Sequence, residues 1–281
     1  MGKIIIIAGP TASGKSEAAL RLAKERPSVI INADSMQIYR EIPILSAQPG
    51  NAERNAVPHK LYGFISAKEE FSAGRWLGLT KHEIDRALKE KITPVVVGGT
   101  GMYLKSLVEG IAAIPDISPE VRDKVRNQFA ETGKEKFHEY LKKIDRAAAE
   151  KIRPSDKQRM IRAAEVFLST GKSILYWREN TKPHYPKEYF SISLMLPDRA
   201  ELYRRCDARF LQMLENGALD EVKNLRELKL PQNSPALKAL GVKELSNYLD
   251  GKISRDEAIK NAQQSTRNYA KRQYTWFKSL S

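Results

Sequence analysis

The chain has 281 residues, of which 41% are hydrophobic and 29% are charged, proportions typical of a globular protein with a full core. Its 48 Lys and Arg against 34 Asp and Glu leave a net charge of +14, a field that attracts polyanions but is only a weak indication of a nucleic-acid partner. One cysteine, Cys206, excludes an internal disulfide, and without Cys/His spacing for zinc or a long apolar run we expect an unexported, cytoplasmic protein.

The first predicted elements are a strand, a glycine-bearing turn and a helix. Residues 4–7 are four consecutive isoleucines, the pattern of a strand buried on both faces of a parallel sheet. A turn with two glycines follows at residues 9–16. Residues 17–26 then place apolar side chains at helical spacing until Pro27 stops the helix.

Two more strands and a helix continue this layer. Residues 29–31 and 93–97 repeat the buried-strand pattern, and residues 72–91 before the second strand are helical in pattern. We therefore expect residues 1–114 to form the first part of an α/β fold, a P-loop NTPase-like doubly wound parallel sheet.

The composition changes at residues 114–119, after which no strand pattern is convincing before residue 189. Helix starts are expected at Ser118-Pro119, Asp145 and Ser155 or Asp156, and helix ends at Gly133 and, for the last helix, Gly171. Residues 115–188 are therefore predicted to be a small all-helical insertion domain. Residues 189–281 return to the core with a strand over 189–196 and C-terminal helices, the last starting at residue 255.

The clearest functional motif is the turn at residues 9–16, which has the pattern Gly, four residues, Gly-Lys-Ser of a phosphate-binding loop. Its place between a predicted strand and a helix supports the match. Lys15 would contact the terminal phosphates, and Ser16 would ligate Mg²⁺. The phosphate-binding residues are Gly9, Pro10, Thr11, Ala12, Ser13, Gly14, Lys15 and Ser16.

A phosphate-binding loop alone is typical of NTPases and kinases, which hold their metal with an acidic residue at the end of a neighbouring strand. Strand 93–97 is followed instead by Gly98-Gly99-Thr100-Gly101, without a carboxylate. The other strand leads to Asp34, at the edge of the sheet where ligands bind. Asp34 is therefore a metal-orienting acid, a base acting on an acceptor, or a capping residue without chemistry.

The sequence resembles the tRNA dimethylallyltransferase family, whose members are also called tRNA isopentenyltransferases. The resemblance runs nearly end to end. The family signatures stand, in chain order, at residues 9–16, 34–37, 98–103, 156–162, 209–210, 241–244 and 267–273. Each is weak alone, but all of them in this order are highly specific.

The resemblance implies transfer of a dimethylallyl group from dimethylallyl diphosphate to the N6 amine of the adenosine 3′ of the anticodon in tRNA, giving N6-isopentenyladenosine. The phosphate-binding loop would hold the diphosphate, with Mg²⁺ on Ser16. Asp34 would accept the amine proton, Thr100 would hydrogen-bond near the reacting centre, and Arg209 would neutralise the departing diphosphate. The expected catalytic residues are thus Asp34, Thr100 and Arg209.

The resemblance also implies an anticodon stem-loop as partner, whose adenosine must leave its stack to enter an enclosed site. Gln158 and Arg162 share one face of a predicted helix, and apolar residues occupy the other face. Without the resemblance, this would be an ordinary solvated basic face. The expected tRNA contacts are Asp34, Ser35, Met36, Gln37, Thr100, Arg122, Gln158, Arg159, Met160, Ile161 and Arg162.

Three other functions compete with this interpretation. A P-loop small-molecule phosphotransferase or NTPase is disfavoured by the missing acid at the strand end. An adenylate isopentenyltransferase shares the loop and Asp34 but needs no basic helical insertion such as residues 116–190. A non-catalytic RNA-binding protein would not need Asp34, Thr100 and Arg209 together with an intact phosphate-binding loop.

The sequence implies no membrane and no protein partner, so a monomer is expected.

Overall fold

The computed structural model describes residues 3–279, and the chain forms two compact units. We call residues 1–108 and 185–281 the core unit, and residues 109–184 the helical unit. The sequence predicted the helical unit to span residues 115–188. Both predicted limits lie a few residues later in the chain than the limits of this unit. Within the described residues, no helix is long and apolar enough to cross a membrane.

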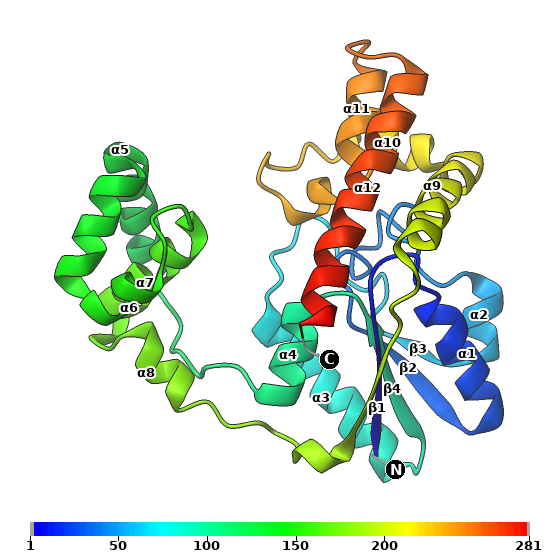
Figure 1. Cartoon of the computed structure of the whole chain (residues 1–281), viewed down its shortest axis with the longest axis horizontal. Coiled ribbons are helices and arrows are strands. Elements are labelled where there is room, and N and C mark those ends of the chain that lie inside the picture. The colour runs from blue at the N-terminus through cyan, green and yellow to red at the C-terminus, as the bar shows by residue number, and fades with distance from the viewer. Residues whose placement is uncertain (1–2, 280–281) are drawn as a thin grey trace. The chain divides into compact units, whose positions relative to one another are not determined.

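The core unit is built on a parallel sheet of five strands in the order β3-β2-β4-β1-β5 (Figure 1). The strands are β1 (Ile4–Ala8), β2 (Ser28–Asn32), β3 (His59–Lys60), β4 (Thr93–Gly98) and β5 (Phe190–Leu194). Every residue of β1 and β2 is buried, which is why each contains a continuous β-branched run, residues 4–7 and 29–31, without alternation of polar and apolar residues. The predicted α/β fold with a P-loop-like parallel sheet is confirmed.

Helices cover both faces of this sheet. They are α1 (Lys15–Glu25), α2 (Asn51–Ala56), α3 (Ala73–Lys89) and α4 (Gly101–Glu109). Ile5 and Ile7 of β1 pack in one cluster with Ala19 of α1, whereas Ile4 and Ile6 pack in another with residues of α3 and α4. Successive residues of a strand point to opposite faces, so α1 and α3 lie on opposite sides of the sheet.

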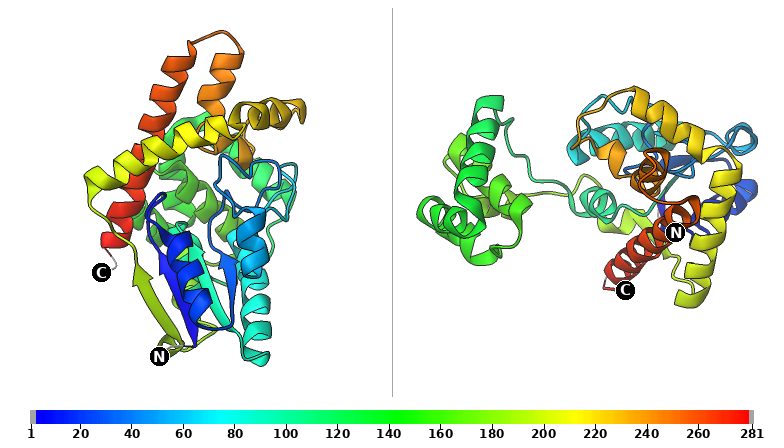
Figure 2. Two further views of the ribbon diagram at one scale, coloured as in Figure 1. Left: turned by 90° about the vertical axis from the view of Figure 1, so that its right-hand side faces the viewer. Right: turned by 90° about the horizontal axis from the view of Figure 1, so that it is seen from above.

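The C-terminal helices lie beyond the carboxyl ends of the strands (Figures 1 and 2). They are α9 (Arg199–Glu215), α10 (Ala218–Glu227), α11 (Val242–Leu249) and α12 (Arg255–Lys278), preceded by the 3-10 turns η1 (Lys187–Tyr189) and, before α11, η2 (Pro235–Lys238). Their buried side chains form a second core with residues 36–47. Glu221 fastens that segment, because its carboxylate accepts hydrogen bonds from the amides of Ile44 (2.7 Å) and Leu45 (2.8 Å).

The helical unit contains only helices among its elements: α5 (Pro119–Ile144), α6 (Arg146–Lys151), α7 (Lys157–Thr170) and α8 (Ile174–Glu179). Ser118, Asp145 and Asp156 cap the first three, as predicted. The helix end predicted at Gly133 is wrong, and the one predicted at Gly171 is confirmed although it does not close the last helix. Gly133 (φ 73°) interrupts α5, but the helix resumes because Phe137 and Leu141 are buried in the core of this unit. Gly171 ends α7, but α8 follows it, capped by Ser173.

Candidate active site

The phosphate-binding loop joins β1 to the first turn of α1 at the carboxyl edge of the sheet. Gly14 has φ 91° and Ala12 has φ 61°, both in the left-handed region. A glycine adopts this conformation freely, whereas for alanine it costs about 1–2 kcal/mol. These turns bring backbone N–H groups together at the positive end of a helix dipole, an arrangement that binds anions.

Two partly buried cations flank this loop. The Nζ atom of Lys15 donates to the carbonyl of Pro10 (2.6 Å), and the guanidinium of Arg209, on α9, donates to the hydroxyl of Thr11. Burial lowers the pKa of Lys15 to about 8, an effect that Asp34 partly offsets and Arg209 reinforces. Burial also lowers the pKa of Arg209. In the described part of the chain neither cation forms a salt bridge, so a bound anion would stabilise both.

Asp34 follows β2 and is held by its neighbours. Its Oδ1 atom accepts from the amide of Met36 (2.9 Å), and its own amide donates to Oδ1 of the fully buried Asn32 (2.7 Å). Asn32 is fixed in turn by a hydrogen bond to the carbonyl of Leu61 (2.9 Å). The Oδ2 atom of Asp34 has no hydrogen-bond partner among the described residues. It is therefore a carboxylate oxygen able to accept a proton.

Thr100 connects the loop after β4 to the segment that carries Asp34. Its Oγ1 atom accepts from the amide of Ser35 (2.9 Å), and its amide donates to the carbonyl of Ala33 (3.1 Å). Gly98 allows this close approach, because a Cβ atom there would overlap the same carbonyl. Thr100 does not line the two cavities described below, so its contact with a substrate stays a prediction.

Gln273 completes the loop, a role that was not expected from the sequence. Its Oε1 atom accepts from the amide of Thr11 (2.8 Å), and its Nε2 atom donates to the carbonyl of Gly99 (2.8 Å). Gln273 stands in the buried row of α12 that includes Ala270 and Phe277. A side-chain amide in a mostly apolar row was the signal that could have identified it.

Two adjoining cavities open at this edge of the sheet. One, of about 480 Å³, is lined by the phosphate-binding loop from Thr11 to Ser16 together with arginines of α9. The other, of about 320 Å³, is lined in part by Phe210, Met213 and Tyr269. Burial raises the pKa of Tyr269. The residues that line both are Thr11, Asp34, Ser46 and Arg209. The arrangement can hold an anion in one cavity and a largely apolar group in the other, with a carboxylate and an arginine at the junction.

The predicted tRNA contacts next to Asp34 are divided between the two cavities. Ser35 and Met36 line the smaller cavity, whereas Gln37 lines the larger one. Gln37 also donates from its side chain to the carbonyls of Ser46 (2.9 Å) and Ala47 (2.7 Å), so it shapes the cavity wall.

The remaining candidates belong to the helical unit. Gln158 is exposed, Arg159 pairs with Asp156 (2.7 Å), and Arg162 lies 3.5 Å from the buried Glu165. Ile161 is half-buried, and the Nε atom of Arg122 is buried without a hydrogen-bond partner. Met160 is completely buried in the core of this unit, so its side chain offers no surface to RNA. A tRNA contact on this helix therefore rests on the exposed polar residues.

Comparison with known proteins gives one consistent family. The model of the family "IPP transferase" matches residues 37–280, and that of "Isopentenyl transferase" matches residues 2–62. A tRNA dimethylallyltransferase of Ehrlichia chaffeensis is 43% identical over 99% of this chain and 91% of the relative, and one of Rhodopseudomonas palustris is 45% identical over 98% and 85%.

Solved structures agree with these relatives. A tRNA isopentenylpyrophosphate transferase from Bacillus halodurans is 31% identical, with a TM-score of 0.69 over 99% of this chain and 87% of that chain. A eukaryotic dimethylallyltransferase described as acting on tRNA is 30% identical, with a TM-score of 0.87 over 98% of this chain and 70% of that chain.

Proposed function

The chain belongs to the tRNA dimethylallyltransferase family, and from this premise we propose that it transfers a dimethylallyl group from dimethylallyl diphosphate to N6 of the adenosine 3′ of the anticodon in tRNA. One observation carries the proposal. Asp34 and Arg209 stand together where the cavity lined by the phosphate-binding loop meets the largely apolar cavity. A base and an anion-stabilising cation are what this transfer needs on the two sides of the reacting carbon.

In the proposed complex the diphosphate occupies the phosphate-binding loop and the dimethylallyl group points toward the apolar cavity. The loop amides, Lys15 and Arg209 hold the phosphate oxygens. The extruded adenine reaches Asp34 through the smaller cavity, because Ser35 and Met36 line that side. The two substrates therefore meet at Asp34.

The chemical step exchanges one bond for another. The N6 nitrogen forms a bond to C1 of the dimethylallyl group as the C1–oxygen bond to the diphosphate breaks. The nitrogen gives up a proton, which passes to Oδ2 of Asp34. The diphosphate leaves with the electron pair of the broken bond, and Lys15 and Arg209 stabilise its growing charge. An aromatic amine is a weak nucleophile, so the positioned carboxylate assists its attack.

The residues present fit the proposed Mg²⁺. The hydroxyl of Ser16 lines the larger cavity and makes no hydrogen bond within the described residues, so Ser16 would hold the ion together with oxygens of the diphosphate. When bound, the ion neutralises charge on the leaving group. No cluster of three or more acidic, His or Cys side chains exists in the described residues, in agreement with a site completed by the substrate.

A direct assay tests the function. The protein is incubated with dimethylallyl diphosphate, Mg²⁺ and an unmodified anticodon stem-loop, and the nucleosides are analysed by mass spectrometry. We expect N6-isopentenyladenosine, and no product when guanosine replaces the target adenosine. Prenylation of AMP in place of the stem-loop would point to an adenylate isopentenyltransferase. Rapid ATP hydrolysis without any prenylation would contradict the proposal.

We also propose that the protein is a cytoplasmic monomer, since its acceptor is tRNA and no partner chain enters the proposed reaction.

We expect tRNA recognition to depend on Gln158 and Arg162, which lie one turn apart on α7. The double variant Gln158→Ala, Arg162→Ala should bind the stem-loop about 30-fold more weakly, because each of the two lost polar contacts is worth ~1 kcal/mol. Loss of Arg162 alone should also reduce the slope of log affinity against log salt by about 0.7, whereas loss of the neutral Gln158 should not.

The measurement is stem-loop affinity across a salt series, with circular dichroism to confirm folding. Glu165 keeps Arg126 as a neighbour at 3.8 Å in the variant, so its buried carboxylate is not left alone. Arg146→Ala is the matched control, because Arg146 is an exposed arginine of the same unit that also pairs with a glutamate (Glu150, 2.9 Å). An unchanged affinity in the double variant would make this helix face an ordinary solvated surface.

A further inference from the structure

A second arginine of α9 faces the phosphate-binding loop. Glu201, Arg205 and Arg209 are spaced by four residues and so share one face of the helix. Arg209 meets Thr11 near the start of the loop. Arg205 stands near its other end, with its Nη1 atom 3.8 Å from the position that a Cβ atom would occupy on Gly14. Both arginines line the larger cavity.

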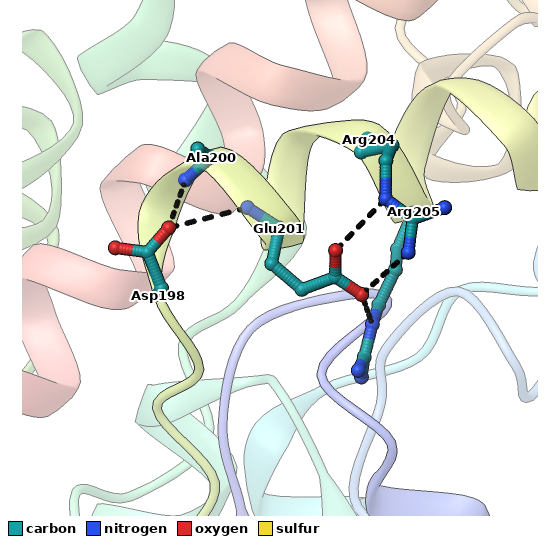
Figure 3. Close-up of polar contacts among 5 residues, drawn as sticks. All are labelled: Asp198, Ala200, Glu201, Arg204 and Arg205. Carbon is teal, nitrogen blue, oxygen red and sulfur yellow. Dashed lines mark hydrogen bonds and ion pairs between the residues drawn. The ribbon is translucent and has the colours of Figure 1, made fainter.

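Glu201 holds this second arginine in place (Figure 3). Its Oε1 atom accepts from Nε of Arg205 (2.6 Å), and its two oxygens accept from Nη2 and Nε of Arg204, both at 2.8 Å. Hydrogen bonds from Arg204 and Arg205 lower the pKa of Glu201 to about 2, so it remains charged at neutral pH. Asp198 fixes the start of the helix by accepting from the amides of Ala200 (2.8 Å) and Glu201 (3.3 Å).

Only part of the hydrogen-bonding capacity of the Arg205 guanidinium is used within the protein. Its Nε atom is bound to Glu201, whereas its Nη1 and Nη2 atoms have no hydrogen-bond partner in the described part of the chain. The carboxylate of Glu201 neutralises only one of the two positive charges of Arg204 and Arg205, so these three residues together carry a net positive charge at the cavity. A guanidinium held through Nε presents its two Nη groups as a planar fork, the geometry that suits phosphate.

We propose that Arg205 binds the terminal phosphate of dimethylallyl diphosphate and that Glu201 is the positioning residue that aims it. Arg209 lies beside Asp34 and serves the phosphate bonded to the reacting carbon, whereas Arg205 lies over Gly14 and serves the other phosphate. The inference rests on the proposed function and assigns each end of the leaving group its own arginine.

Arg205→Ala tests the proposal. We expect the KM for dimethylallyl diphosphate and the inhibition constant of inorganic diphosphate to rise about tenfold or more, because a charge-assisted hydrogen bond is lost. Stem-loop affinity and the melting temperature should stay the same. Arg205→Lys should recover part of the affinity as a point charge. Arg86→Ala is the matched control, since Arg86 is a similarly exposed arginine between two glutamates on α3 and should change neither constant.

Glu201→Gln tests the positioning role. Alone it should raise both constants about threefold, and in the Arg205→Ala background it should add nothing, because Glu201 acts through Arg205. An additional effect in that background would overturn the positioning role. Unchanged inhibition by inorganic diphosphate in folded Arg205→Ala would overturn the phosphate contact.

The same experiments separate this proposal from the proposed function. If the wild-type protein prenylates the stem-loop but Arg205→Ala behaves like wild type, only the assignment of Arg205 fails. If the wild-type protein prenylates nothing, the proposed function fails, and calorimetric titration with inorganic diphosphate still measures whether Arg205 contributes to binding.

Discussion

Asp34→Ala is expected to lower the rate of prenyl transfer by about 10² to 10⁴-fold, which corresponds to ~3 to 5 kcal/mol of transition-state stabilisation. The free Oδ2 atom of Asp34 stands at the junction of the two cavities, so its loss removes the proton acceptor and leaves both binding cavities in place. Single-turnover prenylation of a stem-loop at saturating substrates measures the effect, and stem-loop affinity should remain within about twofold of wild type.

Asp34→Asn distinguishes chemistry from local structure. An asparagine oxygen can still accept the hydrogen bond from the amide of Met36, so this variant keeps the turn but cannot take up the proton. We therefore expect it to be nearly as slow as Asp34→Ala. Recovery of the wild-type rate in Asp34→Asn would make Asp34 a structural cap and remove it from the mechanism.

Lys15→Ala is expected to raise the KM for dimethylallyl diphosphate by about 10- to 100-fold, because the loop loses a partly buried charge that would bind the diphosphate. ATP should remain dispensable for turnover in every variant. Isothermal titration with inorganic diphosphate provides the second measurement. Lys15→Arg is the control that retains a positive charge at this position.

The pH dependence of the wild-type protein follows from the same residue. Lys15 has a pKa lowered to about 8 by burial, so in the free protein it is charged below that pH and neutral above it. Diphosphate binding should therefore be complete below about pH 8 and weaken as the pH rises through this value, and kcat/KM should fall with it. Lys15→Ala should lack this step. A wild-type profile that is flat through pH 8 would contradict the assignment.

The local features of this protein could be predicted from its sequence, because their causes are local. Strands β1 and β2 are buried on both faces, so β1 is entirely apolar and the centre of β2 is the apolar run Val29-Ile30-Ile31. The phosphate-binding loop is specified by neighbouring residues, and the caps Ser118 and Asp156 act within one helical turn. Asp34 could be placed at the site because the carboxyl ends of parallel strands share one edge of a sheet.

The features that could not be predicted depend on residues far apart in the chain. Gln273 binds Thr11, which lies 262 residues earlier, and periodicity within α12 says nothing of that partner. The ion pair between Arg267 and Asp207 of α9 (2.6 Å) likewise joins residues 60 positions apart, which periodicity within one helix cannot reveal. Gly133 was expected to end a helix, and only the buried residues beyond it explain why α5 resumes.

The two hydrogen bonds of Gln273 have a consequence for how the protein is made. Thr11 leaves the ribosome 262 residues before Gln273 does. Until Gln273 emerges, the amide of Thr11 and the carbonyl of Gly99 lack the partner that joins them. The order of synthesis therefore delays completion of the diphosphate site until α12 has been made, so that a nascent or prematurely terminated chain that stops before this helix contains the loop sequence without the finished site.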